Sequence, residues 1–447
     1  MRAIILAAGE GKRMKSNLPK VLHKVCGKPM LNYIIDACKN AGIEKIAVVV
    51  GHQADTIKSS IADVEFFLQS EQLGTGHAVI CAKDFINDDD DVLILNGDIP
   101  LITCETIKKL YSVHGENSLT LISTVVENPN GYGRIVRRDG KFLRIVEDKD
   151  ADKNEKLVNE INVGVYLFNS SALKTALQFL GNDNAQKEYY LTDTIEIIRT
   201  MNDNIGVFCG ENAQEFLGVN DKVQLAYVTS LMQKRINKKH MQNGVTMISP
   251  ETVYIEENVE IGRDTIIYPN VILEKNTKIG QNCIIGSNSR LVDCNILDEV
   301  EIWQSVIFNS TVKSKTKVGP FAYIRPDCVI GENVKVGDFV EVKNSNIGAG
   351  TKISHLTYIG DSDVGKNINF GCGTVTVNYD GKEKFRTKIG DNSFIGCNTN
   401  LIAPVSVGEN SYIAAGSTIT DDIPPNSFAI ARQRQINKSN WKDKRSK

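Results

Sequence analysis

The chain has 447 residues, more than one hydrophobic core usually organises, and two domains are therefore expected. Its formal net charge of −2 gives no reason to expect a nucleic acid or an acidic membrane as partner. The apolar residues 3–9 are soon followed by charged ones, so we expect neither a signal peptide nor a membrane span. The ten cysteines include no Cys-x-x-Cys pair, which favours reduced thiols in a cytoplasmic protein over a zinc site or a disulfide framework.

Strand-like and helix-like segments alternate in the first half of the chain. Residues 3–8, 45–50 and 92–95 are short apolar runs typical of buried strands, and residues 30–40 have helical spacing. This alternation predicts a mostly parallel, doubly wound sheet. Ligands of such sheets bind at the carboxyl ends of the strands, and three motifs fall there.

The first motif is the glycine-rich segment 6–14, Leu-Ala-Ala-Gly-Glu-Gly-Lys-Arg-Met, followed by Leu-Pro-Lys at 18–20. A glycine-rich turn directly after a strand lets backbone N–H groups approach a phosphate, whose charge Arg13 and Lys20 can neutralise. The spacing is neither that of a dinucleotide-binding loop nor that of a P-loop. An ordinary turn with solvated basic side chains is equally compatible with it.

The second motif, residues 68–78, reads Leu-Gln-Ser-Glu-Gln-Leu-Gly-Thr-Gly-His-Ala. Gly74 and Gly76 would let a flat group lie against the backbone, and Gln69 and Thr75 offer the donors and acceptors that a nucleobase edge needs. The alternative is a polar loop leading into a helix, in which His77 is structural.

The third motif, residues 93–100, places Asp98 at the end of an apolar strand. A carboxylate there is costly to bury without a partner, and a cation is the obvious one. Mg²⁺ bound to a triphosphate takes only one or two protein oxygens. A turn or helix-capping aspartate is the competing interpretation.

The order of these motifs resembles the sugar-1-phosphate nucleotidyltransferase family, and the match continues through residues 131–135, 145–147, 160–162 and 218–220. The resemblance implies that a sugar 1-phosphate attacks the α-phosphorus of UTP and releases pyrophosphate. It implies catalytic roles for Arg13 and Lys20, and Asp98 and Asn220 as ligands of Mg²⁺. Lys12 departs from the threonine that is usual at its position. The implied nucleotide and sugar contacts are Leu6, Gly9, Gly11, Lys20, Gln69, Gly74, Thr75, Gly133, Glu147, Asn162 and Asn220.

Apolar residues at helical spacing and a basic run follow Asp221, and Gly244 is a plausible end of this helix. We place the domain boundary here. The predicted domains are a nucleotidyltransferase (uridyltransferase) domain at 1–221, a linker helix at 222–244, a second domain at 245–436, and a polar tail at 437–447.

In the second half an apolar residue returns at every sixth position, from Ile255 without a slip to Leu297, then from Val306 to Val342. After a one-residue deletion the series continues at Ile347, and a last series starts at Ile389. Period six predicts coils with three faces that stack into a prism. A β-sandwich would space its turns by about eight to twelve residues. Glycine commonly follows these apolar anchors, which we interpret as corners that need a positive φ.

Two features interrupt the repeats. The period fails between residues 376 and 389, where Asn-Tyr-Asp-Gly at 378–381 and several basic residues predict an extruded loop. The other is His355, the only histidine within the repeats, two residues after the anchor Ile353. An imidazole suits general-base chemistry on an amine, and Arg325 and Lys343 could bind a phosphate. A structural histidine on a solvated prism face is the alternative.

The repeats resemble the hexapeptide-repeat left-handed β-helix family, many of whose members are trimeric acyltransferases. Residues 324–326, 341–343, 355–358 and 378–381 are similar to the acetyltransferase half of the bacterial bifunctional N-acetylglucosamine-1-phosphate uridyltransferase/glucosamine-1-phosphate acetyltransferase family. This implies His355 as the base. The implied glucosamine-phosphate contacts are Arg325, Lys343, Tyr358 and Asn369, and the implied acetyl-CoA contacts are Cys372, Asn378, Tyr379, Cys397, Ala415 and Arg432.

Together the resemblances imply an α/β, Rossmann-like nucleotidyltransferase domain, a linker helix and a C-terminal left-handed parallel β-helix, assembled as a homotrimer. The implied enzyme acetylates glucosamine 1-phosphate with acetyl-CoA and then, with Mg²⁺, transfers uridylyl from UTP to N-acetylglucosamine 1-phosphate. A single-activity nucleotidyltransferase with a structural or regulatory β-helix is the alternative, and a non-enzymatic scaffold is a third. Cys372 and Cys397 stand where alanine and serine are usual, which also raises a cysteine acyl-enzyme as a minor hypothesis.

Overall fold

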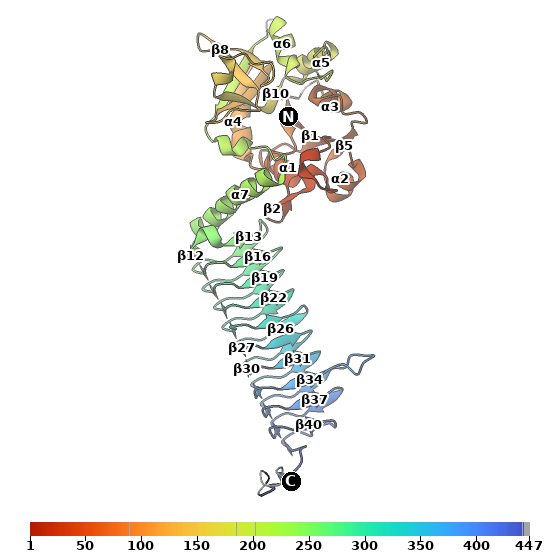
Figure 1. Ribbon diagram of the computed structural model, residues 1–447, viewed down its shortest axis with the longest axis vertical. Coiled ribbons are helices and arrows are strands. Elements are labelled where there is room, and N and C mark those ends of the chain that lie inside the picture. The colour runs from red at the N-terminus through yellow and green to blue at the C-terminus, as the bar shows by residue number, and fades with distance from the viewer. Residues whose placement is uncertain (89, 185, 202, 440, 442–447) are drawn as a thin grey trace. The chain divides into compact units, whose positions relative to one another are not determined.

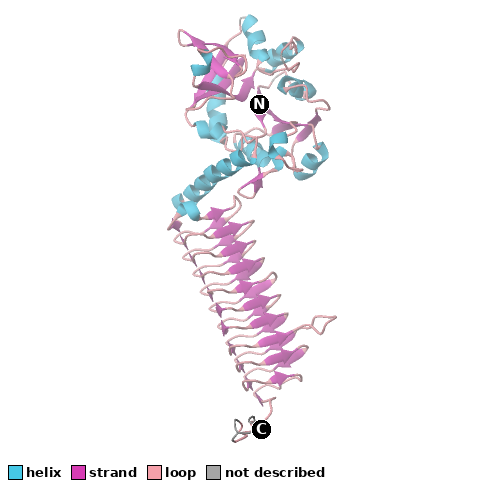
Figure 2. Cartoon of the chain, in the orientation of Figure 1, coloured by secondary structure: helices cyan, strands magenta, loops and turns pink. Residues whose placement is uncertain are grey.

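The computed structural model describes residues 1–439 and 441, apart from residues 89, 185 and 202. Most of the predicted tail at 437–447, namely residues 440 and 442–447, thus lies outside the described residues. The chain divides into two compact units, Met1–Met232 and Gln233–Lys447. The first is a mixed α/β unit and the second a stack of short strands (Figures 1 and 2). None of the helices in the described part of the chain combines the length and apolarity that a membrane crossing requires.

The first unit is built on a nine-stranded sheet with the main order β11-β7-β10-β6-β1-β4-β5, to which β8 and β9 are added beside β10. β6, β1, β4 and β5 are parallel, as are β7 and β11, whereas β10 is antiparallel to both of its neighbours. The predicted α/β sheet is confirmed, but it is mixed rather than mostly parallel, because β10 pairs antiparallel with β6, β7 and β8, and β8 pairs antiparallel with β9. The strands are β1 (Arg2–Ala7), β4 (Lys45–Val50), β5 (Glu65–Leu68), β6 (Val92–Asn96), β7 (Leu119–Val125), β8 (Arg134–Arg138), β9 (Lys141–Val146), β10 (Glu160–Phe168) and β11 (Ile205–Gly210), with a small hairpin of β2 (Lys24–Val25) and β3 (Lys28–Pro29).

Helices cover both faces of this sheet, which explains why its central strands are continuous apolar runs. Ala3 and Ile5 of β1 pack into one core cluster with Ile34 of α1, while Ile4 packs into the other with Leu173 of α5. The predicted helix at 30–40 and the three predicted strands are confirmed. The helices are α1 (Met30–Asn40), α2 (Ala54–Ser60), α3 (Thr75–Cys81), α4 (Cys104–His114), α5 (Ser170–Gln178) and α6 (Asp193–Thr200).

A 21-residue helix, α7 (Lys222–Gln242), contains the point at which the two units divide. It is followed by Gly244 at φ +93°, a conformation that ends helices and suits glycine. Its second half belongs to the second unit and satisfies backbone groups of the first coil. Gln233 accepts from the N–H of Ile255, and buried Asn237 donates to the carbonyls of Pro250 and Val253.

The second unit consists of three parallel sheets of eleven, ten and nine strands, and every third strand pairs within the same sheet. Three strands therefore make one coil of a parallel β-helix, as predicted (Figure 2). The first sheet contains β12 (Thr246–Met247), β15 (Ile266–Ile267), β18 (Ile284–Ile285), β21 (Glu301–Ile302), β24 (Lys317–Val318), β27 (Lys335–Asp338), β30 (Lys352–His355), β33 (Asn369–Phe370), β36 (Phe394–Ile395), β39 (Tyr412–Ile413) and β41 (Phe428–Ala429).

The other two sheets have similarly short strands. The second contains β13 (Tyr254–Ile255), β16 (Ile272–Glu274), β19 (Arg290–Val292), β22 (Val306–Phe308), β25 (Tyr323–Ile324), β28 (Glu341–Lys343), β31 (Tyr358–Gly360), β34 (Val375–Val377), β37 (Asn400–Ile402) and β40 (Thr418–Ile419). The third contains β14 (Glu260–Ile261), β17 (Lys278–Ile279), β20 (Asn295–Ile296), β23 (Ser310–Val312), β26 (Cys328–Ile330), β29 (Asn346–Ile347), β32 (Ser362–Val364), β35 (Thr387–Ile389) and β38 (Val405–Val407).

The predicted six-residue series is wrong at two anchors. Ile296 pairs with Ile279 and is buried, whereas Leu297 is partly exposed. Likewise Ile307, rather than Val306, is the buried partner of Leu291. Shorter coils cause this, because the inward residues are five rather than six apart at 291–296, 302–307 and 307–312. Two adjacent aliphatic residues are available at both points, and pairing with the previous coil selects one.

The expected reason for glycine after the anchors is also wrong. Corner residues with positive φ are mostly asparagine and aspartate, such as Asn270 and Asn288 at +60°. Gly280, by contrast, needs no positive φ but close approach, since a Cβ there would lie 2.8 Å from the backbone of the next coil at Leu297 and Asp298. Glycine thus serves the close approach of successive coils, and asparagine and aspartate tolerate the left-handed corner.

The extruded loop predicted between residues 376 and 389 is confirmed. β34 ends at Val377 and β35 begins at Thr387, and the chain between them leaves the prism (Figure 1). The Phe385 N–H donates to the carbonyl of Asn378, and Tyr379 and Lys384 form an antiparallel bridge. The loop is therefore an ordered excursion that starts at Asn378.

Candidate functional site

The first unit holds a cleft of about 300 Å³ at the carboxyl ends of β1, β5 and β6, where the three motifs were expected to meet. It brings together Leu6, Gly9, Lys20, Gln69, Gly74, Thr75 and Asp98 of the predicted site. Sequence reasoning missed its other lining residues, which belong to no polar motif or lie between motif positions: Ala7, Ala8, Val21, Gln72, Ala78, Asn96 and Glu188.

Gly11 and Arg13 do not line this cleft. Gly11 has φ +64°, and a Cβ on it would lie 2.8 Å from the Cβ of Lys20. Its place against the stem of Lys20 explains why only glycine fits. Arg13 is exposed in the short 3₁₀ helix η1 (Lys12–Met14), and Lys12 pairs with Glu10 at 2.6 Å.

Lys20, Asp98 and Asn220 form the polar centre of the cleft region. The Nζ of Lys20 donates to Oδ2 of Asp98 at 2.6 Å and to Oδ1 of Asn220 at 3.2 Å. The Val219 N–H also donates to the Asp98 carbonyl, which ties the two segments together. Asp98 and Asn220, which follow Lys20 by 78 and 200 residues in the chain, thereby present two oxygens to its ammonium group. The role of Asn220 as a metal ligand was predicted only from the family resemblance. In the structure Asn220 shares the Lys20 ammonium with Asp98.

The second motif is organised around Gln69, which is 3% exposed. Its Nε2 donates to the carbonyl of Gly74 at 3.0 Å and lies 3.1 Å from Nδ1 of His77. Thr75 lines the cleft, although its hydroxyl accepts from the N–H of Leu191. Gly74 lines the cleft whereas Gly76 does not, and a Cβ on Gly76 would meet Leu180 at 2.4 Å and the carbonyl of Tyr189 at 2.9 Å.

The predicted sugar contacts Gly133, Glu147 and Asn162 lie together but do not line the same cleft. The N–H of Asn162 donates to the Gly133 carbonyl at 2.8 Å, and a Cβ on Gly133 would be 3.5 Å from the Glu147 carboxylate. Burial, and then the charges of Asp150, Asp193 and Asp148, raise the pKa of Glu147. Asn162 also donates to the hydroxyl of Tyr166, a buried neighbour that sequence reasoning missed.

In the second unit, His355 ends β30 and its Nδ1 lies 2.7 Å from Oδ1 of Asp338 in the preceding coil. The two residues are register partners. The same register continues along the prism, because Ile353 pairs with Phe370, Phe370 with Ile395 and Ile395 with Ile413. Two positions after these anchors stand His355, Cys372, Cys397 and Ala415. Three of the residues predicted for acetyl-CoA, Cys372, Cys397 and Ala415, therefore follow the predicted base along one edge of the same chain.

Other predicted coenzyme and sugar-phosphate contacts are close to this edge. Arg432 approaches Gly416, since a Cβ on that glycine would be 3.7 Å from the Arg432 Cδ. Asn369 lies in β33, and Tyr358 begins β31. Cys397 is exposed and Cys372 partly so, and the Asn398 N–H donates to the Cys372 carbonyl at 2.7 Å.

A cluster of basic residues lies on the adjacent sheet. Ile324 pairs with Val342, which places Arg325 and Lys343 in successive coils. Arg325 pairs with Glu341 at 3.0 Å. Lys384 of the extruded loop lies close to Lys343, and the neighbouring ammonium group of Lys343 lowers the pKa of Lys384. The sequence predicted a loop with several basic residues, but it did not predict that Lys384 would join Arg325 and Lys343.

Beneath the basic cluster lies Asp361, a residue that sequence reasoning missed and that is 5% exposed. It accepts from Nδ2 of Asn344 at 2.5 Å and from Nδ2 of Asn378, and it lies 3.4 Å from Nζ of Lys343. Burial opposes its ionisation, yet the bonds from Asn344 and Asn378 and the charge of Lys343 hold the pKa of Asp361 below its usual value. Asp361 thus fixes Asn378 and Lys343, while Tyr379 is exposed in the loop.

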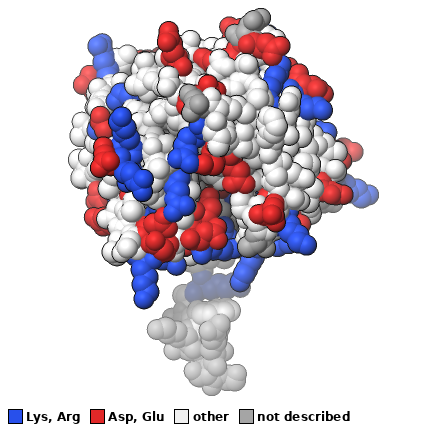
Figure 3. Space-filling model, turned by 90° about the horizontal axis from the view of Figure 1, so that it is seen from above, with Lys and Arg blue, Asp and Glu red and all other residues white. Residues whose placement is uncertain are grey.

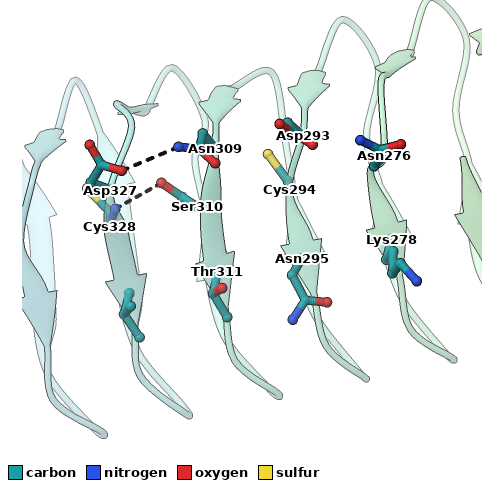
Figure 4. A pocket seen from close by; sticks show the side chains of 11 residues that line it. Asn276, Lys278, Asp293, Cys294, Asn295, Asn309, Ser310, Thr311, Asp327 and Cys328 are labelled. Atoms are coloured by element: carbon teal, nitrogen blue, oxygen red, sulfur yellow. Dashed lines mark hydrogen bonds between the residues drawn. The ribbon is translucent and has the colours of Figure 1, made fainter. Parts of the chain in front are cut away.

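A second hollow, of about 480 Å³, lies on the face formed by β17, β20, β23 and β26 (Figure 4). It coincides with the shortened coils. Within it Nδ2 of Asn309 donates to Oδ1 of Asp327 at 3.3 Å, and the Cys328 N–H donates to the Ser310 hydroxyl at 3.1 Å. None of the predicted site residues lines it. We interpret it as a consequence of coil length rather than as a reaction site.

The described residues contain no cluster of three or more His, Cys, Asp or Glu side chains suited to a metal ion. On the face of the first unit drawn in Figure 3, basic and acidic side chains are interspersed, in keeping with the small net charge. Charge on that face offers no extended single-sign surface for a polyanion.

Residues 2–213 match the nucleotidyl transferase family model. Residues 253–292, 309–344 and 386–421 match the bacterial transferase hexapeptide (six repeats) model. The chain is 53% identical over 449 residues to the bifunctional protein GlmU of Clostridioides difficile (strain 630), with 100% of the chain and 98% of the relative covered. It is 54% identical to the proteins of that description from Acetivibrio thermocellus (99% and 97% covered) and Clostridium beijerinckii (99% and 98% covered).

Proposed function

The chain belongs to the family of bifunctional GlmU proteins, and from this premise we propose two successive reactions, one for each unit. The second unit acetylates the amine of glucosamine 1-phosphate with acetyl-CoA. The first unit then transfers uridylyl from UTP to N-acetylglucosamine 1-phosphate and releases pyrophosphate. UTP and acetyl-CoA are the co-substrates, the product supplies cell-wall precursors, and the cytoplasm is the compartment in which both are available. We propose neither a nucleic acid nor a membrane as a partner of the protein.

For uridylyl transfer, the sugar-phosphate oxygen attacks the α-phosphorus in line and needs no nucleophile from the protein. The work of the chain is to position both substrates and to neutralise charge. Gln69 and Gly74 are proposed for the uracil edge, Gly9, Gly11 and Arg13 for the phosphates, and Gly133, Glu147 and Asn162 for the sugar. Lys20 supplies a positive charge in the same cleft.

Mg²⁺ fits the residues present. Asp98 and Asn220 direct one carboxylate and one carboxamide oxygen to a single point, which the Lys20 ammonium contacts at 2.6 and 3.2 Å. Hard oxygen ligands, one or two in number, are what Mg²⁺ bound to a nucleotide takes from a protein. When bound, the ion supplies charge neutralisation at the triphosphate. With these two oxygens assigned to the ion, the Lys20 ammonium would neutralise phosphate charge in the same cleft.

For acetyl transfer, we propose that His355 accepts a proton from the glucosamine amine as its nitrogen attacks the thioester carbonyl. The C–N bond forms, the C–S bond breaks, and coenzyme A leaves as the thiol after reprotonation. Lys343, Arg325 and Lys384 neutralise the charge of the sugar phosphate in this proposal, with Tyr358 and Asn369 beside it. The coenzyme follows the edge with Cys372, Cys397, Ala415 and Arg432, next to Asn378 and Tyr379.

One observation carries the bifunctional proposal against a β-helix with only a structural role. His355 heads a column of exposed or half-exposed small residues on one edge, and a basic cluster with a buried counter-charge lies on the adjoining sheet. A coil with a purely structural role needs neither this column of small residues nor the basic cluster. A coenzyme that runs along the edge and a sugar phosphate beside it need both.

We further propose a homotrimer, supported by an exposed apolar edge beside His355. Phe321, Phe339 and Leu356 occupy the same corner of successive coils and are 53, 58 and 57% exposed. Their φ values of 58, 55 and 40° lie in the left-handed region, where bulky residues are outliers. The rings of Phe321 and Phe339 stack with centroids 5.5 Å apart. A second copy of the chain would cover this edge and complete the site of His355.

The test separates the two reactions in the full-length protein. With glucosamine 1-phosphate, acetyl-CoA, UTP and Mg²⁺ present, we expect UDP-N-acetylglucosamine, and omission of acetyl-CoA should stop its formation from glucosamine 1-phosphate. Chelation of Mg²⁺ should stop uridylyl transfer while N-acetylglucosamine 1-phosphate still accumulates.

Two variants assign the reactions to their units. Asp98→Ala should lower uridylyl transfer at least about 100-fold and leave acetyl transfer intact. His355→Ala should lower acetyl transfer by about 10² to 10⁴ and leave uridylyl transfer intact. If acetyl-CoA turnover by His355→Ala equalled that of the wild type, the alternative of a regulatory β-helix would stand instead.

A further inference from the structure

The strand that carries His355 differs from its neighbours in length. β27 and β30 have four residues each, whereas every other strand of their eleven-stranded sheet has two. The added pairing brings Asp338 opposite His355 as register partners. Regular pairing therefore extends as far as the candidate base in these two coils alone.

Tight backbone packing holds this extension in place. A Cβ on Gly337 would lie 2.0 Å from the carbonyl oxygen of Ser354, so glycine is required for the two strands to approach. The N–H of Leu356 donates to the Asp338 carbonyl at 3.0 Å, and the Thr357 hydroxyl donates to the His355 carbonyl at 2.6 Å. The backbones of Asp338 and His355 are thus fixed on both sides of the side-chain contact.

The contact determines which ring nitrogen carries the proton. Nδ1 of His355 lies 2.7 Å from Oδ1 of Asp338, and an ionised carboxylate can only accept hydrogen bonds. Nδ1 must therefore donate. In the neutral imidazole the lone pair is then on Nε2, the nitrogen farther from Asp338.

We infer that Asp338 is a positioning residue for acetyl transfer, which holds His355 in the tautomer whose Nε2 accepts the proton of the attacking amine. This rests on the proposed role of His355. As the proton reaches Nε2, the imidazole becomes an imidazolium that keeps its Nδ1–H bond to the carboxylate. Asp338 stays ionised throughout, and the Nε2 proton is available for the departing sulfur.

The charge of Asp338 is compatible with this role. Its hydrogen bond with His355, and next a backbone hydrogen bond, lower the pKa of Asp338. The acid is therefore ionised throughout the neutral range. Both side chains are partly exposed, 59% for His355 and 39% for Asp338, which leaves the imidazole accessible to substrate.

The test uses full-length Asp338→Asn and Asp338→Ala, with Glu332→Gln as a matched control. Glu332 is an exposed acid six residues earlier, so its change removes the same charge away from His355. In Asp338→Asn we expect kcat for acetyl transfer to fall by about 10- to 100-fold, because the amide can also donate and so admits the wrong tautomer. KM for glucosamine 1-phosphate and uridylyl transfer should stay within twofold of wild type, as should all parameters of Glu332→Gln.

A spectroscopic measurement separates positioning from a merely structural effect. In protein with ¹⁵N-labelled histidine rings, the His355 signals, identified by their loss in His355→Ala, should show Nδ1–H in the neutral wild-type ring. Asp338→Asn and Asp338→Ala should show a mixture of tautomers.

Two results would overturn the inference: an unchanged kcat in both Asp338 variants, or a wild-type ring protonated on Nε2. Full acetyl transfer by His355→Ala would instead refute the proposed function itself. Loss of activity in Asp338→Ala together with lost uridylyl transfer would indicate misfolding, and Asp338→Asn, which keeps shape and volume, then decides.

Discussion

At the residue scale, the chemistry of both sites depends on partners that stand far away in the chain. Lys20 could be a solvated base by its sequence context, but its bonds to Asp98 and Asn220 make it part of a three-residue polar centre. Asp361 has no motif of its own, but its burial under Lys343 and Asn378 makes it the counter-charge of the basic cluster. Residue type therefore limits the possible roles, and the neighbours select among them.

The buried carboxylate of Glu147 is expected to lower the stability of the folded protein at neutral pH while it contributes to sugar binding. Its pKa is raised by burial and by nearby acids, so the folded state disfavours the ionised form. The stability it contributes is fully present below the unfolded pKa and is lost as the pH rises through the folded one. Glu147→Gln should therefore raise the unfolding temperature at pH 7.5 and leave it unchanged near pH 4.

The same variant should raise KM for N-acetylglucosamine 1-phosphate by about 10-fold or more, since a charged acceptor is lost. Thermal unfolding at the two pH values and steady-state kinetics measure both effects. Glu127→Gln, at an exposed acid of the same unit, is the control and should change neither. A lower unfolding temperature for Glu147→Gln at pH 7.5 would contradict the assigned direction.

At the element scale, the β-helix shows how strands two to four residues long form a continuous core. Each inward aliphatic residue lies over its register partner in the next coil, and a corner of asparagine or aspartate redirects the chain. Coils of different length are accommodated because only the inward residue must coincide with its partner. The steps of five residues at 291–296, 302–307 and 307–312 are therefore tolerated without a break in the stack.

The corrected anchor can be tested with two adjacent residues. Ile296→Ala removes a side chain that is 1% exposed and should lower the free energy of unfolding by about 2–5 kcal/mol. Leu297→Ala, at a partly exposed position, should cost less than about 1 kcal/mol. Urea unfolding of the full-length chain, followed by residual acetyl transfer, gives the comparison. If Leu297→Ala lowered the free energy of unfolding more than Ile296→Ala does, Leu297 would be the inward residue, as the uninterrupted six-residue series predicts.

At the scale of the whole molecule, the residues proposed for each reaction come from one unit only. Those for uridylyl transfer lie between Leu6 and Asn220, and those for acetyl transfer between Arg325 and Arg432, on either side of the division at Met232 and Gln233. The two activities should therefore be separable by mutation. The acetyl-transfer edge is flanked by the strained apolar corner of Phe321, Phe339 and Leu356, so acetyl transfer is expected to depend on assembly.

Phe339→Glu is expected to weaken the trimer, because a charge would enter a surface proposed to be covered by a second copy. Sedimentation velocity at micromolar concentration should show smaller species, with acetyl transfer reduced at least about 10-fold and uridylyl transfer unchanged. Val329→Glu, at an exposed residue on another face, serves as the control and should remain a trimer. A trimeric Phe339→Glu with full acetyl transfer would exclude this edge as the interface.

By itself the sequence determined the two-part organisation, the strands β1, β4 and β6 of the α/β sheet, the exact bounds of α1 and β4, the period of the prism and the loop after Thr376. These depend on local periodicity and on motifs at strand ends, which neighbouring residues encode. Tertiary structure alone decided between Ile296 and Leu297, filled the space beside Gly76, and joined Asp338 to His355 and Asp361 to Asn378. Those contacts depend on how coils of unequal length come into register, and a hydrogen bond across 17 residues has no periodic signature in the chain.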